Sequence, residues 1–134
     1  MKAPVFGYPL PVATFSPLPD RARERIAERF RALGEPMRLK ILERLFRSPA
    51  SVGDILGSVG GTQANVSKHL AVLHAGGLVR RRRDGLKTVY SIADPTLERI
   101  CAIVCDAVAR GAREEAEATA PATLKSRSAR RTHR

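Results

Sequence analysis

Apolar residues recur three or four positions apart in five segments of the chain, a spacing that places them on one side of an α-helix. The five segments are residues 21–33, 36–48, 51–59, 62–75 and 96–118. Glycine follows the first, third and fourth of them, and glycine commonly ends a helix. The pattern therefore predicts a mainly α protein with five helices.

Residues suited to the start of a helix precede or open four of these segments. Asp20, Ser51 and Thr62 carry side-chain oxygens that can accept a backbone N–H of the first turn. Pro36 stands in the first turn of the second segment, where proline is tolerated. We expect helices to begin at these residues.

The segment between residues 79 and 92 predicts a β-hairpin. Two strands, 79–83 and 88–92, flank the dipeptide Asp84-Gly85, which is common in hairpin turns. Before the hairpin, the third and fourth helices are separated only by Gly60-Gly61. Two helices joined by so short a turn are typical of a helix-turn-helix, and a hairpin directly after it is a wing. We therefore expect a winged helix-turn-helix, an α+β fold that is mainly α.

The charge of the chain narrows the class of partner. Its 134 residues include 24 Lys and Arg against 13 Asp and Glu, a formal net charge of +11. Such a charge favours a polyanion, either nucleic acid or an anionic membrane surface. No apolar run approaches the roughly 20 residues of a membrane span, and prolines interrupt the first residues, where a secretory signal needs an apolar core. With two cysteines, a disulfide framework is not expected. These observations predict a cytoplasmic protein that does not enter membranes.

The fourth helical segment has two contrasting faces. Val66, Leu70 and Leu73 form an apolar stripe. The polar candidates for contact with double-stranded DNA are Thr62, Gln63, Asn65, Ser67, Lys68 and His69. Glutamine and asparagine can pair with adenine in the major groove, and lysine can contact guanine or phosphate. For His69 an alternative stays open, in which its ring forms a hydrogen bond between this helix and its neighbours.

The predicted hairpin carries Arg80 to Arg83 in one strand. Successive side chains of a strand point to opposite faces, so about half of these arginines should face the DNA. We expect Arg81, Arg83 and Lys87 to contact phosphates, which gives binding that depends on salt and little on sequence. The alternative is a basic hairpin that only contacts solvent.

The chain is expected to form a homodimer around one folded domain. The last helix carries Leu97, Ile100, Val104 and Val108 on one side, more apolar surface than a small domain covers by itself. Residues 20–111 are predicted to be the DNA-binding and dimerisation domain. A proline-rich arm, residues 1–19, precedes it, and a charged tail without ordered structure, residues 112–134, follows it.

Four stretches of the sequence together resemble the arsenic-repressor (ArsR/SmtB) family of bacterial winged-helix repressors. They are LGEPMRLKILERL, SVGDIL, NVSKHLAVLHAGGLV and RRRDGLKTVYSI, and the resemblance covers about residues 29 to 108. It implies four helices, a two-stranded hairpin and a fifth helix, with a homodimer formed through the first and last helices. It also implies a repressor that binds an operator and is released when a metal or an oxidant arrives.

The chain departs from this family at the sensor. Many metal-sensing members carry two cysteines on the third helix, and the matching residues here are Ser51 and Gly53. Others use Asp and His on the last helix, but no histidine follows Asp94 in that helix. The remaining candidates are Cys101 and Cys105, which lie four residues apart on one helix face.

Two interpretations of this cysteine pair stay open. Its thiolates could bind a soft metal or metalloid ion or react with an oxidant, and Arg99 nearby would favour the thiolate. Alternatively, both cysteines are small apolar residues that pack. No cofactor is otherwise expected.

The function that follows is a sequence-specific transcriptional regulator, a dimeric repressor with an inducer at the cysteines. The alternative is a basic nucleoid-type or RNA-binding protein without operator specificity. Aromatic residues make up only 4% of the chain, too few for a surface that stacks RNA bases. An enzyme is not expected, since no nucleophile–base set, phosphate loop or metal-hydrolase motif occurs.

Overall fold

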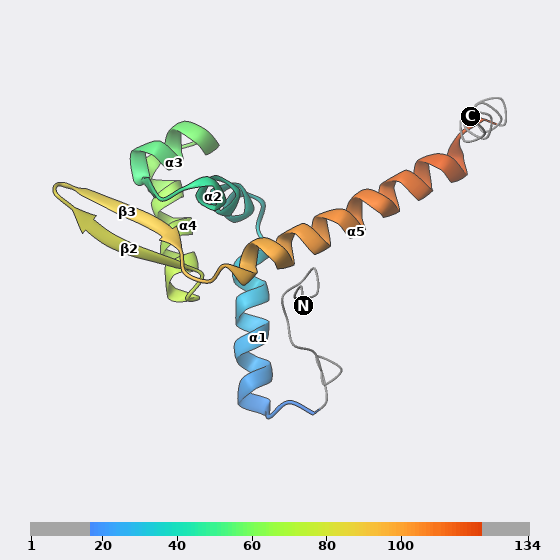
Figure 1. Ribbon diagram of the computed structural model, residues 1–134, viewed down its shortest axis with the longest axis horizontal. Helices are drawn as coiled ribbons and strands as arrows, with labels where there is room; N and C mark the ends of the chain where they lie inside the picture. Colours follow the sequence, from blue (N-terminus) through green and yellow to red (C-terminus); the bar gives the residue numbers. More distant parts are fainter. Residues whose placement is uncertain (1–16, 122–134) are drawn as a thin grey trace, which may run out of the picture. The chain divides into compact units, whose positions relative to one another are not determined.

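A computed structural model of the chain describes residues 17–121. Its elements follow the predicted order, with one additional short strand (Figure 1). They are α1 (Asp20–Leu33), α2 (Pro36–Arg47), β1 (Ala50–Ser51), α3 (Val52–Val59), α4 (Gln63–Ala75), β2 (Val79–Asp84), β3 (Lys87–Ile92) and α5 (Thr96–Thr119). Most of the predicted proline-rich arm and the last part of the predicted tail lie outside the described residues.

The chain divides into two units, one that ends at Leu97 and one that begins at Glu98. The first unit has a single apolar core. Each of α2, α3 and α4 contributes fully buried side chains to it, as do the residue before β2 and the first turn of α5. These side chains are Ile41, Leu42, Ile55, Val66, Leu70, Leu73, Leu78 and Leu97. These include the apolar stripe predicted for α4. The hairpin of β2 and β3 projects away from the helices that enclose this core (Figure 1).

The sheet has three antiparallel strands in the order β1-β3-β2. Both predicted strands of the hairpin are confirmed, and each is one residue longer at the turn than expected. The third strand was not predicted. It consists of Ala50 and Ser51, which pair with Tyr90 and Val89. It ties the start of α3 to the middle of β3.

Two of the three predicted capping residues hold the first turn of a helix. Ser51 Oγ accepts the Asp54 backbone N–H at 3.2 Å, and Asp54 Oδ2 accepts the Ser51 N–H at 3.3 Å. Thr62 Oγ1 accepts the N–H of Asn65 at 3.2 Å. The prediction for Asp20 was wrong. Pro19 occupies the cap position, and Asp20 Oδ1 instead accepts a bond from the Arg23 guanidinium at 2.6 Å.

Glycines end the helices of the helix-turn-helix as predicted. Gly60 and Gly61 both have positive φ, +76° and +85°, and so turn the chain sharply between α3 and α4. After α4, Gly77 has φ +71°. Residues with a Cβ rarely adopt a positive φ. The backbone conformation of these turns therefore explains why glycine occurs in them.

The helix α5 is 24 residues long and forms most of the second unit. It ends one residue beyond the helical segment predicted from the apolar spacing, and so includes residues 112–119, which the expected domain division had assigned to a tail without ordered structure. The domain boundary expected after residue 111 therefore does not coincide with the end of a helix. Ile103, Val104 and Val108 of α5 are exposed. Within residues 17–121, none of the helices has the length and apolarity that a membrane crossing requires.

Candidate nucleic-acid interface

The start of α4 carries exposed polar side chains around its buried stripe. We use the name polar face for five exposed residues: Thr62, Gln63, Asn65, Ser67 and Lys68. Behind them Val66, Leu70 and Leu73 have no exposed surface. The buried stripe fixes α4 to the core, and the polar face remains open to a partner. An exposed set of amide, hydroxyl and ammonium groups on one helix offers the donors and acceptors that base edges recognise.

His69 differs from the five residues of the polar face. Its side chain is only 12% exposed, and its Nδ1 lies 3.5 Å from Glu35 Oε2 and 3.4 Å from Arg38 Nη1. The structure thus places His69 between α4 and the start of α2. This arrangement agrees with the alternative of a hydrogen bond between helices rather than with a base contact.

The register of the hairpin assigns its basic side chains to two faces. Arg81 pairs with Tyr90 and Arg83 with Thr88, so these two arginines lie on the face that carries the buried Tyr90. The remaining basic residues lie on the opposite face: Arg80 and Arg82 pair with Ser91 and Val89, and Lys87 pairs with Asp84. All five are exposed. The expected division of the arginines is therefore present, and Lys87 does not share a face with Arg81 and Arg83.

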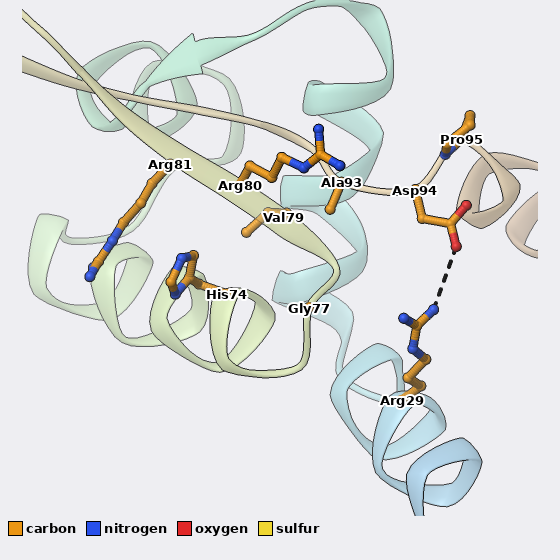
Figure 2. Close-up of a pocket in the computed structure, with 9 residues that line it drawn as sticks. All are labelled: Arg29, His74, Gly77, Val79, Arg80, Arg81, Ala93, Asp94 and Pro95. Atoms are coloured by element: carbon orange, nitrogen blue, oxygen red, sulfur yellow. Dashed lines mark ion pairs between the residues drawn. The ribbon is translucent and has the colours of Figure 1, made fainter. Parts of the chain in front are cut away.

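An open pocket of about 680 Å³ lies at the base of the hairpin. It is lined by Arg29, His74, Gly77, Val79, Arg80, Arg81, Ala93, Asp94 and Pro95. Figure 2 shows Arg80 and Arg81 leaving β2 in opposite directions, with His74 beside Arg81 and Arg29 paired to Asp94 at 3.5 Å. The sequence had not indicated Arg29, His74 or Arg80 as site residues. Arg80 could have been found because it belongs to the arginine run, whereas nothing in the sequence relates Arg29 to the hairpin.

The two cysteines of α5 are free and differ in exposure. Cys105 is exposed and Cys101 is partly buried. Burial raises the pKa of the Cys101 thiol, so the expected preference for the thiolate is not found at that residue. Among the described residues, no group of three or more His, Cys, Asp or Glu side chains comes together as a metal site.

The residues that the resemblance matches to metal sites of the family have other roles in this chain. Ser51 caps α3, and Gly53 has no side chain. Asp94 Oδ1 accepts the backbone N–H of Thr96 at 2.9 Å and its hydroxyl at 2.7 Å. These bonds, the hydroxyl first, lower the pKa of Asp94. Ser51 and Gly53 therefore offer no thiolate to a metal ion, and the two oxygens of Asp94 already have partners in Thr96 and Arg29.

Comparison with known proteins identifies the family. The family model described as "Bacterial regulatory protein, arsR family" matches residues 35–81. The uncharacterized HTH-type transcriptional regulator Rv0081 of Mycobacterium tuberculosis is 42% identical over 85 residues, which are 63% of this chain and 75% of the relative. The probable mercury resistance operon repressor of Streptomyces lividans is 37% identical over 95 residues, which are 71% of this chain and 74% of the relative.

Solved structures agree with this result. The crystal structure of M. tuberculosis Rv0081 superposes with a TM-score of 0.65 at 37% identity, covering 74% of this chain and 98% of the other. A second match is the solution structure of the homodimeric winged helix-turn-helix DNA-binding domain Mb0332 of Mycobacterium bovis. Its TM-score is 0.62 at 31% identity, covering 75% of this chain and 94% of the other. The chain therefore belongs to the arsR family of bacterial regulatory proteins, and it is a DNA-binding transcriptional regulator with a winged helix-turn-helix fold rather than an enzyme.

Proposed function

We propose that this regulator is a cytoplasmic homodimeric repressor that recognises an operator with the polar face of α4 and contacts phosphates with the β2–β3 hairpin. The observation that carries the proposal is the division of α4 into a fully buried apolar stripe and an exposed polar face. Relatives named as repressors support repression over activation, among them the Streptomyces lividans protein and SmtB of M. tuberculosis.

The helix and the hairpin have different tasks in this proposal. Base edges in the major groove are read by short polar side chains such as Gln63, Asn65 and Ser67. The arginines of β2 neutralise phosphates, which adds affinity for any duplex. Specificity should therefore depend on α4, and the salt dependence of binding should depend on the hairpin.

The dimer rests on exposed apolar side chains in both units. In the first unit Phe30 of α1 is 57% exposed, and in the second Val108 of α5 is 67% exposed. A second copy would remove such surface from water. The winged helix-turn-helix domain Mb0332 of M. bovis is homodimeric, which supports the same assembly here.

A gel shift with the DNA upstream of the chain's own gene tests the proposal. We expect specific binding to an imperfect inverted repeat whose half-sites lie roughly 10–10.5 base pairs, or a multiple of that, apart. Gln63→Ala and Ser67→Ala should change the preference among operator variants. Thr119→Ala, an exposed residue at the end of α5, is the control. Equal affinity for operator and random duplexes would contradict the proposal and favour a basic protein without sequence preference.

For the inducer we propose the thiols of Cys101 and Cys105. Metal sensing by the family is indicated by the mercury resistance repressor among the relatives. Two sulfur ligands on one face of α5 suit a soft ion, and further ligands would come from the second copy. The partly buried Cys101 and the exposed Cys105 also leave one thiol open to an oxidant.

Replacing both cysteines by serine tests this second proposal. Hg(II), Cd(II), As(III) or a peroxide should lower the operator affinity of the parent, and a coupling of this kind typically gives about a 5–150-fold change. The double variant should keep its affinity under the same treatments. If it is released like the parent, the cysteines are packing residues and the inducer acts elsewhere.

A further inference from the structure

The side chain of Arg38, in the first turn of α2, contacts two other helices. Its Nε donates to the carbonyl oxygen of Ala32 at 2.6 Å, and its Nη2 donates to that of Arg31 at 3.1 Å. Both carbonyls belong to the last turn of α1, which lacks partners four residues on within the helix; the Arg31 carbonyl also accepts the N–H of Gly34 at 3.3 Å. The third nitrogen, Nη1, lies 3.4 Å from Nδ1 of His69 on α4. One guanidinium thus joins the end of α1 to the middle of α4.

Glu35, the residue before α2, completes this cluster. Its Oε2 accepts the backbone N–H of Arg38 at 2.8 Å and lies 3.5 Å from Nδ1 of His69. The bond from the Arg38 N–H is the main reason that the pKa of Glu35 is lowered. A neutral His69 can accept at Nδ1 from Arg38, and a protonated one can donate there to Glu35. The ring therefore has a partner in the same place in both charge states.

The cluster supplies directional contacts that the core of α4 lacks. Val66, Leu70 and Leu73 hold the helix by apolar burial, which does not depend on direction. Hydrogen bonds weaken steeply when their angle changes. His69 lies one helical turn after Asn65 and next to Lys68, so a contact that fixes His69 also fixes the polar face.

We propose that Glu35, Arg38 and His69 form a positioning junction that sets how α4 presents its polar face to the operator and links that presentation to α1. The inference rests on the proposed role of α4 in operator recognition. The junction does not touch bases itself. The junction also requires arginine at position 38. The planar guanidinium directs separate donors to two carbonyls and an imidazole, which a single lysine ammonium cannot do.

The test compares the affinities of variants for the operator and for a random duplex of equal length at fixed salt. We expect His69→Ala to bind the operator about tenfold more weakly while its affinity for the random duplex stays within about twofold. His69→Asn should retain most of the operator affinity, because its amide can occupy the place of Nδ1. Arg38→Lys should behave like His69→Ala although it keeps the charge. Val72→Ala, an exposed residue of the same helix outside the junction and the pocket, should match the parent.

Unfolding in urea shows whether each variant is folded at the assay temperature. If His69→Ala is not folded, the comparison of Arg38→Lys with His69→Asn decides, since both keep a polar group in place. The inference is overturned if the folded variants bind the operator like the parent, or lose affinity for both duplexes alike. Gln63→Ala separates the two proposals. If Gln63→Ala retains full specificity for the operator, α4 does not read the operator. If Gln63→Ala loses specificity but His69→Ala retains it, only the junction is refuted.

Discussion

Ser51 and Asp54 show how two side chains can determine the start of a short helix. The helix α3 has only eight residues, and helices of this length are unstable in isolation. We expect Ser51→Ala to lower the free energy of unfolding by about 1 kcal/mol, as is typical for the loss of a cap. Urea unfolding measures the change. Ser58→Ala, later in the same helix, removes a hydroxyl that bonds to a helix carbonyl and should cost less; equal costs would contradict the capping role.

The carboxylate of the same cap predicts a dependence on pH. The hydroxyl and then the N–H of Ser51 lower the pKa of Asp54. A lowered pKa in the folded state stabilises the protein above the ordinary aspartate pKa of about 4, and this stabilisation is lost as the pH falls through the folded value. The difference in unfolding free energy between the parent and Asp54→Asn should therefore be constant above about pH 5 and shrink in acid. A difference that grows in acid would refute the assignment.

Single residues also show where prediction from the sequence ended. The caps at Ser51 and Thr62 were predictable because their acceptors lie within the same turn. For His69 the sequence left two interpretations open, because the partners that distinguish them are 34 and 31 residues away in the chain. The sequence also did not show how far Cys101 is buried. We expected Arg99 to favour the thiolate, whereas burial raises the pKa of the Cys101 thiol.

At the scale of elements, the glycines of the helix-turn-helix differ in whether their backbone conformation excludes other residues. Gly77 has φ +71°, and no atom lies close to where a Cβ would be. Gly77→Ala should therefore destabilise the protein by about 1–2 kcal/mol through backbone strain alone. Gly57 lies within α3 without a positive φ or a close neighbour. Gly57→Ala should instead stabilise by about 0.5–1 kcal/mol. Thermal or urea unfolding of both variants checks the predicted opposite signs.

The hairpin yields a prediction from its register. Arg81 and Arg83 share the face of the buried Tyr90, and Arg80 and Arg82 share the other. We expect alanine at both Arg81 and Arg83 to lower the slope of log affinity against log salt by roughly two, about one per phosphate contact, for every duplex tested. Alanine at Arg80 and Arg82 is the matched control and should change the slope less. A larger effect of the control pair would assign the phosphates to the other face.

Elements with a long periodic pattern were predictable, and the short strand was not. The helices gave clear apolar spacing and glycine stops, and Asp84-Gly85 marked the turn of the hairpin. The order predicted from these signals is confirmed. The strand β1 has two residues, too few for any alternation to show. It exists because Ala50 and Ser51 lie beside Tyr90 and Val89 in the folded chain, which is a tertiary contact.

At the scale of the whole molecule, the proposed dimer can be tested on α5. Val108→Asp would place a charge within an exposed apolar stripe, and a carboxylate buried without a partner is costly. We expect this variant to sediment as a monomer at micromolar concentration and to bind the operator more weakly than the parent. Ala102→Asp introduces the same residue elsewhere on the exposed surface of α5 and should remain dimeric. A monomeric parent would refute the dimer.

The cap of α3 finally determines whether the first turn of this helix depends on a bound metal ion. Ser51 and Gly53 occupy the positions at which the resemblance places the cysteines of metal-sensing members. A cysteine in place of Ser51 would give up the oxygen that holds the N–H of Asp54. With serine, side chains of the chain itself hold the first turn of α3, and no bound ion is needed there.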